Sequence, residues 1–289
     1  MKLKSILNKF HSVLDDEYGK EEVNSFFDLL LDYYLGIKRI QLVLDSNYMV
    51  TSAQEQLFLN ALNKLKTHKP IQYIIGETEF YGLSFKVNEH TLIPRPETEE
   101  LVDWIIKSHS KINRNPQLEI LDIGTGTGCI AISLAKKIPK AKVCALDVSE
   151  DALKIARVNA DLNEVVLKCI HGNILNPSEI GFNYESKNFD IIVSNPPYVR
   201  DLEKAEIQPN VLEYEPHLAL FVTDENPLQF YKIICGFAQL NLKNEGVLYF
   251  EINEYLAEEM IQLLKDYGFK NVELKKDLFG KDRMIKGVK

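Results

Sequence analysis

The sequence predicts an α/β fold in which a mostly parallel, seven-stranded sheet follows a small all-α bundle and a β-hairpin linker. From about residue 93, strand and helix patterns alternate, which is typical of a parallel sheet covered on both faces. Before residue 70, apolar residues recur at helical spacing. Between them lies a short segment of alternating residues around a glycine. A chain of 289 residues suits two unequal domains, and we expect the parts to be 1–69, 70–92 and 93–289.

The first 69 residues show three amphipathic helical stripes and no residue of catalytic character. Ser52, with Glu55 three residues later, predicts a capping box, and Pro70 ends the third stripe. We expect the stripes to form the core of a small helical bundle. The stripes consist of Leu3, Ile6, Leu7, Phe10, Val13 and Leu14; of Val23, Phe26, Phe27, Leu30, Leu31 and Tyr34; and of Leu57, Leu59, Leu62 and Leu65.

Residues 71–92 change character. Ile71, Tyr73 and Ile75 alternate with other residues, and two short strand-like runs then surround Gly82. This pattern predicts a β-hairpin that connects the two domains.

The C-terminal part contains the alternating elements. We expect strands at 118–123, 142–147, 166–171, 189–194 and 247–252, and an antiparallel hairpin at the sheet edge from 271–275 and 284–288. Helical patterns lie near 127–137, 149–161, 226–242 and 254–267.

Composition and charge narrow the function classes. The formal net charge of −8 argues against a protein that grips naked nucleic acid, because such proteins mostly carry a basic face. No apolar run approaches the roughly 20 residues that cross a bilayer, and the N-terminus does not resemble a signal peptide. We therefore expect a cytoplasmic protein without a membrane partner. Its four cysteines form no C-x-x-C pair, which favours buried, reduced thiols over a metal site.

A glycine-rich turn is the sharpest local signal. Gly124, Thr125, Gly126, Thr127 and Gly128 follow an apolar strand and open a helix. In a doubly wound sheet such a turn lies at the carboxyl end of the first strand, where ligands bind. Glycines let the backbone approach a ligand without a Cβ in between.

The next two strand ends extend this candidate cofactor site. Asp147 ends the second strand, where a carboxylate can accept both hydroxyls of a ribose. After the third strand, Asn173 is placed to bind the amino edge of an adenine, and Ile174 to pack on its face; an ordinary turn is an equal alternative. The order G-x-G-x-G departs from the dinucleotide fingerprint, because Cys129 stands at its third glycine position.

The fourth strand ends in Asn195, Pro196, Pro197 and Tyr198, which we interpret as a socket for a flat –NH₂ group. Tandem prolines remove two N–H donors, so acceptor carbonyls remain, and the Asn195 side chain adds another acceptor. Tyr198 offers an aromatic face. An amide nitrogen is a poor nucleophile, and acceptors that hold its two protons favour a nitrogen whose lone pair points at the methyl donor. No strong general base is required.

In this order, the loop, Asp147 and the socket resemble those class I methyltransferases, with a Rossmann-like fold, that modify exocyclic or amide nitrogens. Further segments are similar to the HemK/PrmC family, the N5-glutamine methyltransferases of peptide chain release factors, and this resemblance covers essentially the whole chain. These segments are residues 72–77, 79–83, 91–99, 215–221 and 276–283.

The resemblance implies a specific reaction. The substrate would be the glutamine of the Gly-Gly-Gln motif in release factors, held by Asn195, Pro196, Pro197 and Tyr198. The glycine-rich loop, Asp147 and Asn195 would contact S-adenosyl-L-methionine, with S-adenosyl-L-homocysteine as product and no metal. The helical domain would help to dock the release factor, and no stable nucleic-acid binding is expected.

Some positions depart from the family pattern. Residues 222–225 and Asn253 stand where the family usually has glycine, which leaves the conformation of those two loops open. Asn173 stands where an Asp is common, and Ile174 where an aromatic residue is common.

Three alternatives remain open on the sequence. The same socket suits the amino group of a flipped base, as in a nucleic-acid methyltransferase acting on adenine N6 or guanine N2. A binding module could keep the cofactor fold without turnover. A nicotinamide-dependent oxidoreductase shares the strand–loop–helix unit and Asp147.

Overall fold

The computed structural model describes residues 1–45, 47–110, 117–180 and 188–289. Its contacts divide the chain into two compact units. The first comprises Met1–Gly76 and Gln208–Tyr214, and the second comprises Glu77–Ile207 and Glu215–Lys289. The chain thus leaves the second unit for a short segment and then returns to it.

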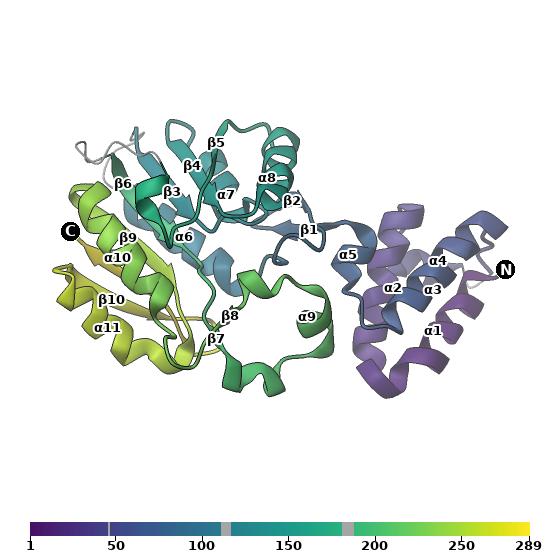
Figure 1. The fold of residues 1–289 in the computed structure, drawn as a ribbon. Coiled ribbons are helices and arrows are strands. Elements are labelled where there is room, and N and C mark those ends of the chain that lie inside the picture. The colour runs from purple at the N-terminus through teal and green to yellow at the C-terminus, as the bar shows by residue number, and fades with distance from the viewer. Residues whose placement is uncertain (46, 111–116, 181–187) are drawn as a thin grey trace. The chain divides into compact units, whose positions relative to one another are not determined.

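The first unit is helical (Figure 1). It has its own apolar core. The core is formed by the predicted stripes, with Leu3, Ile6, Phe27 and Leu30 fully buried or nearly so. The segment Gln208–Tyr214 also belongs to this unit. The hydroxyl of Tyr214 donates to the carbonyl oxygen of Thr67 at 2.5 Å and holds this segment in place. Its helices are α1 (Leu3–Tyr18), α2 (Lys20–Leu35), α3 (Arg39–Leu44), α4 (Ser52–Leu65), α5 (Ile71–Ile75) and α9 (Pro209–Tyr214).

Several local predictions in this unit are wrong. The capping box at the start of α4 is formed by Thr51 and Gln54, because Thr51 is still extended while Ser52 is already helical. Phe58 is buried there and Leu57 is exposed, so the third stripe is displaced. Val13 is likewise exposed.

The alternating residues 71–75 form the helix α5 rather than a strand, and α3 is absent from the predicted elements. Short apolar runs do not distinguish helix from strand by periodicity alone. Here Gly76 ends the helix in a left-handed conformation, with φ of 81°.

A β-hairpin opens the second unit, as predicted. Strand β1 (Glu77–Phe80) pairs antiparallel with β2 (Leu83–Lys86). The two turn residues, Tyr81 and Gly82, both have positive φ, which suits the right-handed twist of a tight hairpin.

The seven-stranded sheet of the second unit confirms the predicted architecture (Figure 1). Its strand order is β10-β11-β9-β6-β3-β4-β5, and only β11 runs against the others. The strands are β3 (Glu119–Ile123), β4 (Lys142–Asp147), β5 (Leu167–His171), β6 (Phe189–Ser194), β9 (Leu242–Glu251), β10 (Lys270–Lys276) and β11 (Asp282–Val288). β9 begins earlier than predicted, because the polar residues 243–245 interrupt the apolar pattern although the backbone is already extended.

Helices cover both faces of this sheet, and each face has its own core. Alternate residues of one strand point to opposite sides, so Ile191 packs with one core and Ile192 with the other. On the first face lie α6 (Pro96–Ser110), α7 (Cys129–Lys137) and α8 (Glu150–Leu162); on the second lie α10 (Gln229–Asn241) and α11 (Ala257–Asp266). α6 is absent from the predicted helices, although Pro96 at its start and Glu97 and Glu99 in its first turn are typical helix-start signals.

No helix in the described residues is long and apolar enough to cross a membrane. Among the same residues, no group of three or more His, Cys, Asp or Glu side chains is arranged to hold a metal ion. The four cysteines are free: Cys129 and Cys235 are buried, while Cys144 and Cys169 are only half-buried, against the expectation for all four.

Candidate active site

The glycine-rich loop joins β3 to α7, and each of its glycines has positive φ, a conformation that other residues rarely adopt. At Gly124 and Gly126 an added Cβ would meet no atom within 4 Å. At Gly128 it would lie 2.9 Å from Ile132 Cδ1 and 3.3 Å from Ala156 Cβ. The first two glycines therefore keep the backbone open, and the third allows α7 to pack closely against α8.

A buried carboxyl group at the end of β3 forms a hydrogen bond with this loop. Asp122 is fully buried and accepts a hydrogen bond from the Thr125 hydroxyl at 2.6 Å, while its other oxygen has no partner among the described residues. Burial raises the pKa of Asp122 to about 7. Thr125 and Thr127 are buried as well.

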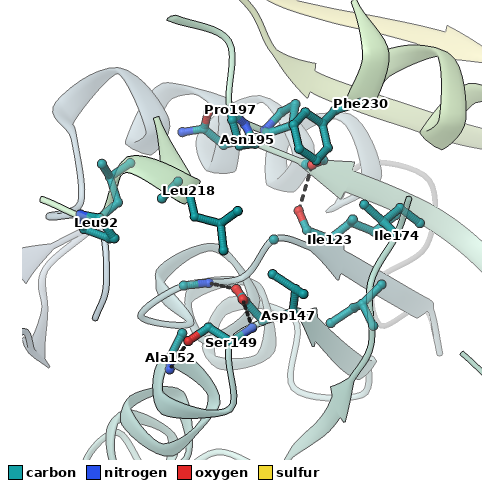
Figure 2. Close-up of a pocket in the computed structure, with 18 of the residues that line it drawn as sticks. Leu92, Ile123, Asp147, Ser149, Ala152, Ile174, Asn195, Pro197, Leu218 and Phe230 are labelled. Atoms are coloured by element: carbon teal, nitrogen blue, oxygen red, sulfur yellow. Dashed lines mark hydrogen bonds between the residues drawn. The ribbon is translucent and has the colours of Figure 1, made fainter. Parts of the chain in front are cut away.

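Asp147, at the end of β4, is tied to the same loop (Figure 2). Its Oδ2 accepts a hydrogen bond from the backbone N–H of Gly126 at 2.8 Å, and its Oδ1 accepts one from Ser149 at 2.9 Å. Burial raises the pKa of Asp147, and these hydrogen bonds act against that rise. The two hydrogen bonds therefore fix the orientation of the carboxylate.

The residues after β5 lie beside it. Asn173 Oδ1 accepts a hydrogen bond from the backbone N–H of Leu175 at 2.9 Å, which fixes a local turn. Ile174 is buried and belongs to the core on the side of α10 and α11.

These strand ends surround a cavity of about 270 Å³ (Figure 2). Of the predicted site residues, Gly124, Gly126, Asp147, Asn173, Ile174, Asn195, Pro196 and Pro197 line it. Thr125, Thr127, Gly128 and Tyr198 do not. The cavity is also lined by residues that were not predicted as site residues, namely residues 89–92, Pro216, Leu218, Ala219, Phe230 and Ile234.

The Asn-Pro-Pro-Tyr turn follows β6 and presents two different sides. Asn195, Pro196 and Pro197 face the cavity. The hydroxyl of Tyr198 instead donates to Oε1 of Glu251 at 3.1 Å. Burial raises the pKa of Tyr198 well above its usual range, so the phenol stays neutral.

Behind the turn lies a short chain of buried polar groups. Glu251, at the end of β9, is 1% exposed and accepts a hydrogen bond from the Thr98 hydroxyl at 2.6 Å. The side-chain nitrogen of Asn195 in turn donates to that hydroxyl oxygen at 3.3 Å. Burial raises the pKa of Glu251, whereas the hydrogen bonds from Thr98 and Tyr198 and the nearby Arg283 lower it.

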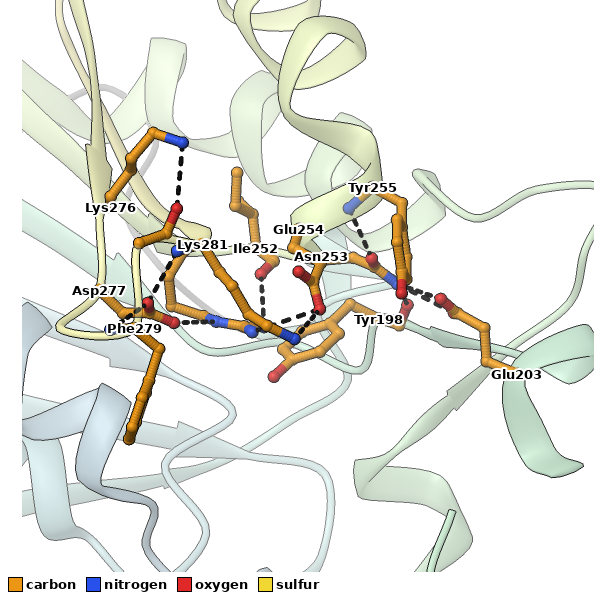
Figure 3. Close-up of polar contacts among 12 residues, drawn as sticks. Tyr198, Glu203, Ile252, Asn253, Glu254, Tyr255, Lys276, Asp277, Phe279 and Lys281 are labelled. Carbon is orange, nitrogen blue, oxygen red and sulfur yellow. Dashed lines mark hydrogen bonds and ion pairs between the residues drawn. The ribbon is translucent and has the colours of Figure 1, made fainter. Parts of the chain in front are cut away.

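A second residue after β9 fixes the other end of the turn (Figure 3). Asn253 donates from Nδ2 to the carbonyl oxygen of Tyr198 at 3.1 Å and to Glu203 Oε2 at 2.9 Å. Its φ of −67° is an ordinary one, so this position does not require a glycine. Arg200 pairs with the same Glu203, at 3.1 Å between Nη2 and Oε1.

An ion pair joins two walls of the cavity. Arg95 Nη2 lies 2.6 Å from Oε1 of the buried Glu215, and the backbone N–H of Ile93 donates to the other oxygen of that carboxylate. The bridge connects the segment before α6 with the segment that supplies Pro216 and Leu218.

Sequence reasoning gives no role to Thr98, Glu251 or Glu215. Thr98 and Glu215 lie within segments on which the family resemblance depends, and Glu251 lies two residues before Asn253. Nothing in the local pattern of the three indicates a partner that is distant along the chain. Thr98 and Glu251, for example, are 153 residues apart. Only the folded sheet brings them together.

Two families match parts of the chain. Residues 109–216 match the family described as Methyltransferase small domain, and residues 5–76 match that described as PrmC N-terminal domain. Among solved structures, a T. thermophilus 16S rRNA methyltransferase in complex with AdoMet and guanosine is similar in fold, with a TM-score of 0.53 at 16% identity over 74% of this chain and 49% of that chain. The second unit thus has the class I methyltransferase fold predicted from the sequence.

Similarity to curated proteins extends over the whole length. The release factor glutamine methyltransferase of Flavobacterium psychrophilum is 54% identical over 286 residues, which cover 99% of each chain. That of Bacteroides thetaiotaomicron is 42% identical over 272 residues, 94% of this chain and 95% of its own. At this identity and coverage, the chain belongs to the family of release factor glutamine methyltransferases.

Proposed function

We propose that this chain transfers a methyl group from S-adenosyl-L-methionine to the side-chain amide nitrogen of the glutamine in the Gly-Gly-Gln motif of peptide chain release factors. One observation carries the proposal: the turn of Asn195, Pro196 and Pro197 lines the same cavity as Gly124, Gly126 and Asp147. An acceptor-rich turn for an amide and a candidate nucleoside site therefore open into one space. The names of the curated relatives support the choice of substrate.

The family and the fold imply use of S-adenosyl-L-methionine, and the residues present fit it. Gly124 and Gly126 leave the space that a Cβ would fill open to the cavity. Each oxygen of Asp147 accepts one N–H from the protein, and a carboxylate oxygen can accept a second hydrogen bond, which suits the two hydroxyls of a ribose. Asn173 and Ile174 would border the adenine. When bound, the cofactor supplies an electrophilic methyl group on its sulfonium.

The amide acceptor would be held by Asn195, Pro196 and Pro197. The prolines lack N–H donors, so their carbonyl groups and the side-chain oxygen of Asn195 offer acceptors to the two amide protons. Acceptors aimed at these protons stabilise the positive charge that develops on nitrogen during transfer. Tyr198 would fix the turn through Glu251, and contact of its ring with the amide stays a prediction. The proposed reaction requires no metal and no strong base.

We propose that the helical part, residues 1–69, helps to dock the release factor, while residues 70–92 link it to the methyltransferase domain at 93–289. The match of residues 5–76 to a family-specific N-terminal domain supports this division of labour. Because release factors act in translation, the proposal also implies a cytoplasmic location.

Peptide mass spectrometry tests the proposal. A purified bacterial release factor, incubated with the chain and S-adenosyl-L-methionine, should gain one methyl group on the glutamine of Gly-Gly-Gln. A methyl group on any other residue, or none in the presence of bound cofactor, would contradict the proposed substrate.

A further inference from the structure

Asn195 belongs to the proposed amide-binding turn, but an asparagine side chain can present either of two unlike atoms. Its Oδ1 accepts a hydrogen bond, and its Nδ2 donates one. An amide –NH₂ substrate needs an acceptor. If the side chain were rotated by half a turn, a donor would face the substrate protons and the socket would repel them.

We propose that Glu251 is a positioning residue that sets this choice: through Thr98 it holds the side-chain nitrogen of Asn195 away from the substrate and leaves the oxygen as the acceptor. The inference rests on the proposed function and names residues that would make its socket work. Neither Thr98 nor Glu251 lines the cavity.

The direction of the hydrogen bonds follows from the number of protons. Thr98 has one hydroxyl proton, and its Oγ1 lies 2.6 Å from Glu251 Oε2 and 3.3 Å from Asn195 Nδ2. A carboxylate only accepts, so Thr98 must donate its proton to Glu251. Its oxygen is then left as an acceptor, and only the –NH₂ end of Asn195 can complete the contact.

Hydroxyl donors surround Glu251. Both of its oxygens receive hydroxyl protons, one from Thr98 and one from Tyr198 at 3.1 Å. Burial is the largest effect and raises the pKa of Glu251, whereas these two donors and the positive charge of Arg283 act against that rise. Both Thr98 and Glu251 are at most 3% exposed, so water cannot easily replace either bond.

Rotation of the Asn195 side-chain amide by half a turn would be energetically unfavourable beside Thr98. Its Oδ1 would then face the lone pairs of Thr98 Oγ1 with no proton between the two oxygens. Burial makes such an unpaired contact more unfavourable than it would be in water. In the orientation found, no protein donor among the described residues contacts Oδ1, so this oxygen is left for a ligand.

Two substitutions interrupt the series of hydrogen bonds from Glu251 through Thr98 to Asn195 at different points. Glu251→Gln keeps the shape but adds an –NH₂ that can donate to Thr98, which frees the threonine proton for Asn195 Oδ1 and allows the reversed orientation. Thr98→Val keeps the shape and removes the hydroxyl. Thr98→Ser keeps the hydroxyl and should rescue activity. Tyr231→Phe is the matched control, because the Tyr231 hydroxyl donates to the backbone carbonyl of Glu251 at 3.0 Å without touching the chain of side chains.

The test measures kcat for methyl transfer to a purified release factor together with the calorimetric Kd for S-adenosyl-L-methionine. We expect kcat to fall by about 10–100-fold in Glu251→Gln and Thr98→Val, the usual scale for a residue that orients another. Kd should be unchanged in both, and Thr98→Ser and Tyr231→Phe should stay within a few-fold of the parent.

The outcomes distinguish failure of the inference about Glu251 from failure of the proposed function. Parental kcat in Thr98→Val overturns the inference while the proposed function stands, and so does an equal loss in Thr98→Ser or Tyr231→Phe, which would indicate a general packing effect. If Glu251→Gln does not fold, the comparison of Thr98→Val with Thr98→Ser decides alone. If the unchanged chain does not methylate the release factor at all, the proposed function fails and the inference fails with it.

Discussion

The carboxylate of Asp147 accepts a hydrogen bond from the backbone N–H of Gly126 at 2.8 Å, which connects the end of β4 to the glycine-rich loop after β3. This hydrogen bond holds two cavity-lining segments together. The connection makes Asp147 both a proposed ligand for the ribose and a support for the loop.

Replacing Asp147 should therefore weaken cofactor binding. We expect Asp147→Ala to raise the calorimetric Kd for S-adenosyl-L-methionine at least roughly 10–100-fold, since one hydrogen bond to a charged group contributes about 1.5–3 kcal/mol. Asp151→Ala is the control, because Asp151 is exposed and pairs with Lys154 at the surface. An unchanged Kd in Asp147→Ala would show that the ribose site lies elsewhere.

Removing the Asn195 side chain should affect the chemical step. Asn195→Ala is expected to lower kcat by about 10²–10³-fold, the scale for the loss of one preorganised polar partner at developing charge. Because Asp147 and the glycine-rich loop are untouched, S-adenosyl-L-methionine should still bind. Parental turnover in this variant would refute the socket mechanism.

The glycines of the loop should respond differently to substitution. Gly128→Ala should lower the free energy of unfolding most, because φ of 82° costs about 1–2 kcal/mol for an L-residue and overpacking against Ile132 and Ala156 adds about 1–3 kcal/mol. Gly126→Ala should lower the free energy of unfolding only by the cost of its positive φ, because an added Cβ would meet no atom within 4 Å. It should weaken cofactor binding, because this Cβ would enter the open space at the cavity. Denaturant unfolding and calorimetry on both variants separate the two effects, and equal stability losses would contradict this division of roles.

Asp122 should make stability depend on pH. Burial raises its folded-state pKa to about 7, above the usual value of 3.8. A raised pKa means that the folded protein keeps a proton that the unfolded chain releases. The resulting contribution to the free energy of unfolding is present below about pH 4 and is lost as pH rises to about 7.

Asp122→Asn removes this titration while its side-chain oxygen can still accept from Thr125. The free energy of unfolding of the variant, measured relative to the parent, should therefore increase with pH between about 4 and 7, by at most about 1.4 kcal/mol per pH unit. Denaturant unfolding at several pH values checks this. A difference that does not change with pH would show that Asp122 titrates normally.

Sequence patterns predict the central part of this molecule well because its signals are local. The glycine-rich loop, Asp147 and the Asn-Pro-Pro-Tyr turn each follow a buried strand, and parallel strands bring their carboxyl ends to one edge of the sheet. Eight of the predicted site residues accordingly line one cavity.

The features that the sequence does not predict depend on contacts between residues far apart along the chain. The apolar run at 71–75 is too short to distinguish helix from strand, and tertiary contacts settle it as α5. The ring of Tyr198 stays a predicted stacking face for the amide, but no local pattern indicates the hydrogen bond from its hydroxyl to Glu251, a residue far along the chain. Pairings such as Thr98 with Glu251 and Arg95 with Glu215 depend on the whole fold and leave no local pattern.

The most direct test of the central claim is a methyl-transfer assay with labelled S-adenosyl-L-methionine. A purified release factor and its Gln→Ala variant at Gly-Gly-Gln are offered separately, with DNA and RNA in parallel. If the glutamine of Gly-Gly-Gln is the methyl acceptor, label enters the unchanged release factor alone. Label in the Gln→Ala variant or in nucleic acid would contradict it.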